Sequence, residues 1–259
     1  MDNEIWPGAE TLRVGGGDIG VVLSHGFTGS VMSVAPWARA LADGCNARVI
    51  APRLTGHGTT VEDLGTSRWT DWYTDVEAAW AELSATCRTV FVGGLSMGGA
   101  LALRLAQKHP VDGVLLVNPA IRSRNKLLPF AGVLRHIIDT QPGIASDIRR
   151  EGVTELAYDE ASVAAAWEMT QLWKQVRSDL SRVAAPVLLF RSDVDHVVDD
   201  SSHQALQRAL PATETVRLSN SHHVATLDND DELIFQRSVR FVLEHSSRTY
   251  HGADGASAH

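Results

Sequence analysis

The feature that most constrains this chain is a glycine-rich turn between a strand-like and a helix-like stretch, within residues 90–106. Residues 90–93 favour a strand, and residues 100–106 have helical spacing of apolar side chains. Between them, Gly94-Leu95-Ser96-Met97-Gly98 matches the G-x-S-x-G pattern of a nucleophile elbow. Side chains at the two glycines would collide with the approaching backbone of such a sharp turn. The pattern predicts a serine hydroxyl held at a helix N-terminus, where negative charge is stabilised.

The rest of the chain alternates between short apolar strands and amphipathic helices. Strands are expected at residues 11–14, 19–24, 47–51, 113–117, 186–190 and 215–218, and helices at 36–42, 69–83, 202–210 and 232–244. Such alternation predicts an α/β fold with a mostly parallel central sheet and helices on both faces. The first two strands are expected to pair as a hairpin around a turn at residues 15–18.

The alternation breaks between residues 120 and 185, a stretch longer than one crossover helix requires. We interpret residues 120–172 as an inserted helical cap, or lid. Residues 1–119 and 173–247 then form the core, which includes the last helix of the interrupted region. Residues 248–259 are polar and rich in glycine, alanine and serine, and are expected to form a disordered tail.

Composition excludes several classes of function. The formal charge of −8, without a basic stripe, argues against a nucleic-acid partner. Two cysteines give neither a disulfide framework nor a metal-binding spacing, and are expected to be reduced thiols. The N-terminus lacks the features of a signal peptide, and no apolar run is long enough to span a membrane. We therefore expect a cytoplasmic protein, while its oligomeric state cannot be inferred.

A serine hydroxyl needs a base to take its proton and an acid to orient that base. On this kind of sheet the acid and then the base follow the serine in the chain. The loop after strand 186–190 contains Asp193 and Asp195, and the loop after strand 215–218 contains His222 and His223. Both loops emerge at the sheet edge where Ser96 is expected. Spacing alone does not decide which of the two aspartates is the acid or which of the two histidines is the base.

An oxyanion formed at Ser96 would need two preorganised backbone N–H donors. We expect one from Met97, which follows the serine, and one from Phe27, in the loop after strand 19–24. His25, in the same loop, is interpreted as a side chain that holds the loop. His57, flanked by glycines, is interpreted in the same way rather than as a catalyst.

Five segments together resemble one known family. They read L-S-H-G-F-T-G-S, R-L-T-G-H-G-T, V-G-G-L-S-M-G-G, S-D-V-D-H-V-V and N-S-H-H-V-A-T-L-D. In combination they are similar to the bacterial monoacylglycerol lipase and small carboxylesterase family of the α/β-hydrolase fold. The resemblance covers about residues 10–245.

The resemblance implies a role for individual residues. It selects Asp195 as the acid and His223 as the base, and it assigns the oxyanion donors to Phe27 and Met97. A cap glutamate followed by L-A-Y reads the glycerol head group in monoacylglycerol-cleaving members, which implies this role for Glu155. The chain departs from the family at His222, where relatives often have glycine or an aromatic residue.

The expected function is a serine ester hydrolase that cleaves monoacylglycerols or similar small fatty-acid esters through an acyl-enzyme. The alternatives are a general short-chain carboxylesterase and, more remotely, a non-catalytic binding protein on a hydrolase fold. No cofactor and no metal is expected. Arg122, Arg124 and Lys126, beside the apolar residues 127–130, could bring the cap into transient contact with lipid aggregates. An ordinary solvated charge run is the favoured interpretation of these three residues.

Overall fold

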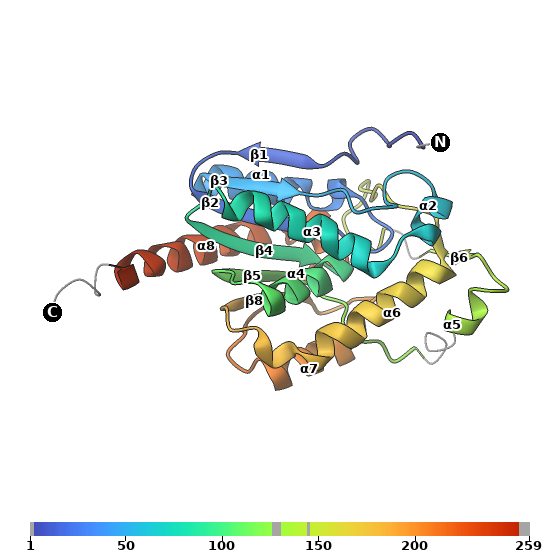
Figure 1. The fold of residues 1–259 in the computed structure, drawn as a ribbon. Helices are drawn as coiled ribbons and strands as arrows, with labels where there is room; N and C mark the ends of the chain where they lie inside the picture. The colour runs from blue at the N-terminus through green and yellow to red at the C-terminus, as the bar shows by residue number, and fades with distance from the viewer. Residues whose placement is uncertain (1–2, 126–130, 144–145, 254–259) are drawn as a thin grey trace.

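The computed structural model describes residues 3–125, 131–143 and 146–253 (Figure 1). A seven-stranded sheet has the order β1-β3-β2-β4-β5-β8-β9. Its strands are β1 (Leu12–Gly15), β2 (Ile19–Ser24), β3 (Ala47–Ala51), β4 (Thr89–Leu95), β5 (Gly113–Val117), β8 (Val187–Ser192) and β9 (Glu214–Leu218). All pair in parallel except β1, which confirms the predicted mostly parallel sheet.

The expected hairpin between the first two strands is wrong. β1 pairs antiparallel with β3, with Leu12 opposite Ala51, so β3 lies between β1 and β2. Every residue of β2 is buried, whereas burial alternates along β1 between half-buried and exposed positions. A strand with one solvated face suits the sheet edge, and a fully apolar strand needs neighbours on both sides.

Helices cover both faces of the sheet, as Figure 1 shows. On one face, α1 (Ala35–Cys45) and α8 (Asp231–Ala253) pack over inward side chains such as Val21, Phe91 and Leu115. On the other, α3 (Trp69–Ser84), α4 (Met97–Lys108) and α6 (Val163–Ser178) pack over alternate residues such as Val22 and Leu116. Besides α5, described below, the other helices of the described residues are α2 (Val61–Thr66), α7 (Asp200–Ala209), and the 3-10 helices η1 (Val31–Ser33), η3 (Leu180–Arg182) and η4 (Ala225–Leu227).

The described part of the predicted cap contains little regular structure before α6. It holds a one-turn helix, α5 (Ala131–Leu134), and a two-stranded sheet of β6 (Thr140–Pro142) and β7 (Glu160–Ser162). The expected cap boundary at residue 172 falls inside α6, which is continuous. Lys126 and the apolar residues 127–130 of the cap lie outside the described residues.

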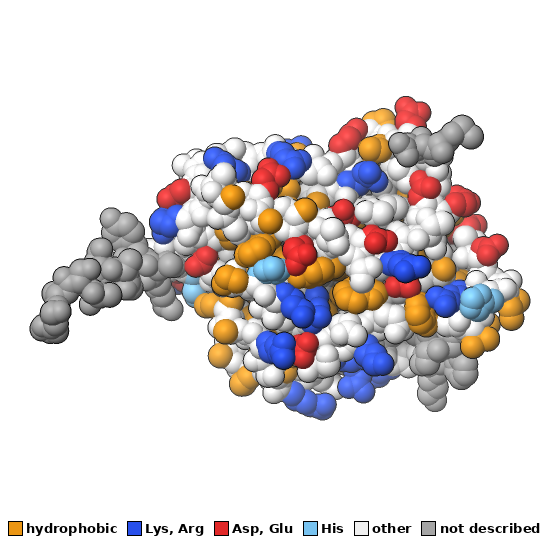
Figure 2. Space-filling view, in the orientation of Figure 1, with side chains coloured by type: hydrophobic (Ala, Val, Ile, Leu, Met, Phe, Trp, Pro, Cys, Tyr) orange, Lys and Arg blue, Asp and Glu red, His pale blue; other side chains and the backbone are white. Residues whose placement is uncertain are grey.

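The last helix is longer than the sequence indicated. We expected it to span residues 232–244 and expected a disordered tail from residue 248, but α8 continues to Ala253. Residues 254–259 of that tail lie outside the described part of the chain. None of the described helices combines the length and the hydropathy that crossing a bilayer requires. Figure 2 shows acidic, basic and apolar side chains intermingled over one face.

Parallel pairing aligns the carboxyl ends of the central strands at one edge of the sheet. Ser24 lies opposite Gly94, Leu95 opposite Val117, and Ser192 opposite Leu218 at neighbouring strand ends. The loops that follow β2, β4, β5, β8 and β9 therefore emerge together. We call this edge, with its five loops, the core edge.

Candidate active site

Ser96 occupies the sharp turn between β4 and α4, in a backbone conformation that few non-glycine residues adopt. Its φ is 56° and its ψ is −117°, values that indicate strain held by the surrounding structure. A Cβ at Gly94 would lie 2.2 Å from the carbonyl carbon of Gly98, and one at Gly98 would lie 2.1 Å from the Ser24 oxygen. Both glycines are therefore required by close backbone approach, as the elbow pattern indicated.

Two buried histidines hold the loop that carries Phe27. The Nε2 atom of His57 lies 2.6 Å from the Phe27 carbonyl oxygen, and the Nδ1 atom of His25 lies 3.0 Å from that of Gly26. Burial lowers the pKa of His25 to about 3 and that of His57 to about 4. Both rings are therefore neutral near pH 7. These contacts agree with the interpretation of both histidines as loop-stabilising side chains.

The backbone amides of Phe27 and Met97 belong to segments next to the serine, and Met97 directly follows it at the start of α4. The Phe27 loop passes close to Ser96, since a Cβ at Gly26 would lie 3.6 Å from the Ser96 Cβ. Among the described residues, neither amide N–H has a hydrogen-bond acceptor, although Met97 is fully buried. Buried N–H groups are almost always paired in folded proteins. Two such donors beside a serine are able to stabilise a developing oxyanion.

His223 and Asp195 are joined by a side-chain hydrogen bond, and both line the same cavity as Ser96. The Nδ1 atom of His223 lies 2.9 Å from the Asp195 Oδ2 atom, and the two side chains are 7% and 10% exposed. The second oxygen of Asp195 accepts backbone N–H groups at residues 197–198, at 2.9 and 2.7 Å, which fixes the carboxylate. Asp193 points elsewhere and pairs with Arg217 at 2.8 Å. The fold thus brings Asp195, rather than Asp193, to the histidine.

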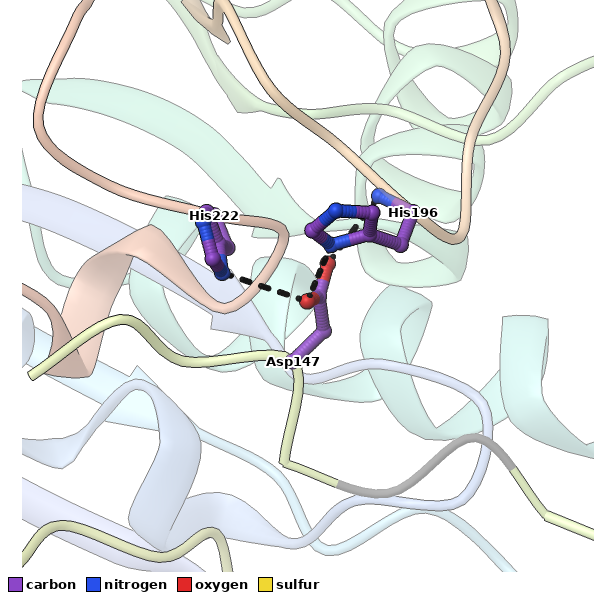
Figure 3. A group of neighbouring side chains, drawn as sticks. All are labelled: Asp147, His196 and His222. Carbon is purple, nitrogen blue, oxygen red and sulfur yellow. Dashed lines mark hydrogen bonds and ion pairs between the residues drawn. The ribbon is translucent and has the colours of Figure 1, made fainter.

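His222 points toward Asp147 in the cap, as Figure 3 shows. Its Nδ1 atom lies 3.4 Å from the Asp147 Oδ1 atom, which also contacts the His196 Nδ1 atom at 2.8 Å. The other oxygen of Asp147 accepts the backbone N–H groups of His196 and His223. Burial favours a raised pKa for Asp147, but these hydrogen bonds outweigh it and lower the pKa. Asp147, His196 and His222 are also spaced to hold a metal ion.

Asn118, at the end of β5, joins the loops of the core edge. Its Nδ2 atom donates to the His223 carbonyl oxygen at 2.8 Å and to the Ser192 Oγ atom at 2.9 Å. Its Oδ1 atom accepts the Ser192 backbone N–H at 2.8 Å. Neither Asn118 nor Asp147 is indicated as a site residue by the sequence motifs. The partners of Asn118 lie 74 and 105 positions away, so no local pattern indicates them.

Residues of the core edge and of the predicted cap line a cavity of about 590 Å³. A volume of this order is typical of a site for a small molecule. Its wall includes four of the predicted residues of the core edge, namely Phe27, Ser96, Asp195 and His223. The cap contributes Glu155, and α6 contributes the apolar side chains of Ala166, Met169 and Trp173.

Glu155 places a carboxyl group in the cavity wall. Its Oε1 atom accepts a hydrogen bond from the Ser33 Oγ atom at 2.5 Å, and its backbone N–H donates to the Ser146 Oγ atom at 2.9 Å. Burial raises the pKa of Glu155, although the Ser33 hydrogen bond and the nearby His223 partly offset this effect. A Cβ at Gly29 would lie 2.6 Å from the Oε1 atom, so the backbone leaves room for the carboxyl group.

Comparison with known proteins gives consistent results over nearly the whole chain. A family model described as serine aminopeptidase, S33 (Hydrolase_4) matches residues 18–230. A thermostable monoacylglycerol lipase of Bacillus sp. (strain H-257) is 39% identical over 247 residues, which cover 92% of this chain and 96% of the lipase. A carboxylesterase of Bacillus subtilis (strain 168) is 25% identical, covering 88% of this chain and 93% of the esterase.

Solved structures show the same likeness. A structure from work on LipS and LipT, two metagenome-derived lipolytic enzymes, superposes with a TM-score of 0.89 at 40% identity. The match covers 93% of this chain and 100% of the chain in that structure. The monoacylglycerol lipase of Paleococcus ferrophilus superposes with a TM-score of 0.75 at 20% identity, covering 91% of this chain and 99% of that one. At that identity the second likeness concerns the fold alone.

Proposed function

The chain belongs to the serine aminopeptidase S33 family of α/β-hydrolases, and from this membership we propose that it hydrolyses monoacylglycerols or similar small fatty-acid esters. It is a carboxylic ester hydrolase, in keeping with its 39% identical relative, a monoacylglycerol lipase. The observation that carries the proposal is the single cavity that Ser96, His223 and Asp195 share with Glu155.

In the proposed reaction the Ser96 Oγ atom attacks the ester carbonyl carbon, and the His223 imidazole takes the serine proton. The Phe27 and Met97 amides stabilise the oxyanion of the tetrahedral intermediate. The imidazolium then passes its proton to the leaving alcohol oxygen, which leaves the acyl group on Ser96. His223 next takes a proton from water, the hydroxyl attacks the acyl-enzyme, and the fatty acid departs as the serine is regenerated.

Asp195 orients the His223 ring and stabilises its charged form during both steps. The contact of 2.9 Å between their side chains supports this role. Neither step draws on a metal or an organic cofactor. We further propose that residues 120–172 act as a cap over the cavity and that residues 1–119 and 173–247 form the core.

Glu155 is the residue proposed to recognise the alcohol part of the substrate. A carboxyl group whose Oε1 atom already accepts a hydrogen bond has a second oxygen available to a glycerol hydroxyl. The apolar side chains of α6 in the same wall suit the acyl chain. This division of the cavity favours an ester with one polar and one apolar end.

The test compares 1-monolauroylglycerol with methyl laurate, using wild type and Glu155→Gln. The glutamine keeps the size of the side chain and its capacity to accept from Ser33. We expect wild type to prefer the glycerol ester. The variant should lose about 10- to 100-fold in kcat/KM on that ester, as expected when a buried hydrogen-bonding group is left without a matched partner, and far less on the methyl ester.

Two results would contradict the proposal. Equal rates on both esters in wild type would indicate a general short-chain carboxylesterase, an activity that one 25% identical relative bears in its name. Absence of hydrolysis together with absence of covalent labelling at Ser96 by a fluorophosphonate would indicate a non-catalytic binding protein.

A cytoplasmic location is also part of the proposal. Cys45 and Cys87 are both free thiols, which suits a reducing compartment. Cell fractionation tests this directly, and recovery of the protein outside the cytoplasm would contradict it.

A further inference from the structure

Three side chains from distant parts of the sequence converge at the junction of cap and core (Figure 3). Asp147 comes from the cap, His196 from the loop after β8, and His222 from the loop after β9. Each offers one ligand atom, and these atoms all lie within 4.8 Å of one another. The Asp147 side chain is 11% exposed, while those of His222 and His196 are 24% and 59% exposed, so an ion can reach them from solvent.

The spacing of the ligand atoms fits a tetrahedral ion. Bonds of 2.0–2.2 Å to nitrogen and oxygen imply about 3.3–3.6 Å between neighbouring ligand atoms in tetrahedral geometry. The Nδ1 atoms of His196 and His222 lie 2.8 and 3.4 Å from the Asp147 Oδ1 atom. All three ligand atoms lie within 4.8 Å of one another, so a modest shift of the exposed His196 ring brings them to this spacing.

The types of donor indicate which ion. Two imidazoles and one carboxylate suit Zn²⁺, whereas Mg²⁺ and Ca²⁺ prefer oxygen ligands throughout. We propose that Asp147, His196 and His222 form a zinc-binding site, with water as the fourth ligand. The two rings coordinate through Nδ1, as the neutral tautomer that carries its proton on Nε2.

The position of the site indicates what zinc binding does. His196 directly follows Asp195, and His222 directly precedes His223, while Asp147 belongs to the cap. Asp147 and His196 also line the cavity. An ion bound by all three cross-links the cap to the two loops that carry the proposed acid and base. Zinc therefore acts as a reversible inhibitor that restrains the cap over the cavity, separate from the proposed metal-free reaction.

Binding is measured on the full chain after treatment with EDTA, by competition with a chromophoric zinc indicator. We expect one high-affinity equivalent of Zn²⁺ per chain, and no competition by Mg²⁺ or Ca²⁺. His196→Gln and His222→Gln should each weaken binding by about tenfold or more. His136→Gln, which removes an exposed histidine elsewhere in the cap, is the matched control and should bind like wild type.

Two further measurements on wild type test the proposal without relying on the folding of a variant or on the proposed substrate. Co²⁺ added to wild type should give the visible absorption of a tetrahedral site, which zinc then displaces. Zinc should slow hydrolysis of a p-nitrophenyl ester, and EDTA should restore it.

Three outcomes would overturn the proposal. Failure of wild type to bind zinc, or equal binding by His222→Gln, would leave Asp147 as the centre of a metal-free hydrogen-bonded contact. Binding without inhibition would refute the regulatory role. Because the binding measurements involve no ester, a failure of the proposed function would appear separately.

Discussion

The core edge and the cap face the same cavity, but they hold their side chains in different ways. At the core edge, Ser96 and His223 are almost fully buried, and His25 and His57 are completely buried beneath the Phe27 loop. In the described part of the proposed cap before α6, Val133 and Ile137 are 66% and 77% exposed, and regular structure is limited to one turn of helix and two three-residue strands. The rigid edge is therefore suited to the chemistry, and the cap to the choice of ester.

Removing the proposed nucleophile has the largest expected effect. Ser96→Ala should lower kcat on any ester by about 10⁴- to 10⁶-fold, because residual catalysis would come only from the oxyanion donors and binding. It should also abolish labelling by a fluorophosphonate. Ser84→Ala, at an exposed serine at the end of α3, is the control and should behave like wild type. Substantial activity in Ser96→Ala would show that the nucleophile lies elsewhere.

The next largest effect on kcat should distinguish Asp195 from Asp193, which lie in the same loop. Asp195→Asn should lower kcat by about 10⁴-fold, because an amide favours the wrong tautomer of the histidine. Asp193→Asn loses only the exposed contact with Arg217 and should keep activity near that of wild type. Rates on a soluble p-nitrophenyl ester, with matched circular dichroism spectra, measure both. A larger loss in Asp193→Asn than in Asp195→Asn would reverse the assignment of the acid.

These two aspartates also show where sequence reasoning stops. The parallel core, the strand ends and the elbow could be predicted, because apolar periodicity and close backbone approach at glycines are local properties. The choice of acid could not be made from spacing, since both aspartates follow the same strand. It required the resemblance to a family, and the fold brings Asp195 to His223.

Features that depend on distant partners were missed or mistaken. β1 pairs with β3 rather than with β2, its neighbour in sequence. The buried strand β2 takes an interior position in the sheet, and the half-exposed β1 takes the edge. Asn118 and Asp147 act through residues far along the chain, so they carry no local signal. The fold class and family are confirmed by the comparisons, whereas the roles of the six proposed site residues stay predictions.

A smaller effect is expected on the pH dependence of the free energy of unfolding, through the two buried histidines that hold the Phe27 loop. The pKa of His57 is about 4 when folded and 6.5 in a model compound, mainly because the ring is buried. Between these values the unfolded chain binds a proton that the folded chain does not. His57 should therefore lower the free energy of unfolding by about 1.4 kcal/mol for each pH unit below 6.5. His25 adds a similar dependence down to its pKa of about 3.

Urea unfolding at pH 7.5, 6.0 and 5.0 measures this dependence. His57→Gln keeps a donor for the Phe27 carbonyl oxygen and should reduce the slope by about 1.4 kcal/mol per pH unit. His136→Gln controls for the loss of an exposed histidine in the cap. A slope unchanged in His57→Gln would mean that this ring titrates in the folded protein.

The smallest expected effect concerns the cap and its contact with lipid aggregates. Apolar side chains lie at the α5 end of the face in Figure 2, and among the described residues Val133 and Ile137 are the most exposed large hydrophobic ones. Serine at both positions should weaken binding to monoacylglycerol-containing vesicles by about five- to tenfold, the loss expected for about 1 kcal/mol of apolar contact. Hydrolysis of a soluble short-chain ester should not change. Leu243→Ser, on α8 and 45% exposed, is the control. If the cap variant bound vesicles as wild type does, the cap would select its ester without touching the lipid surface.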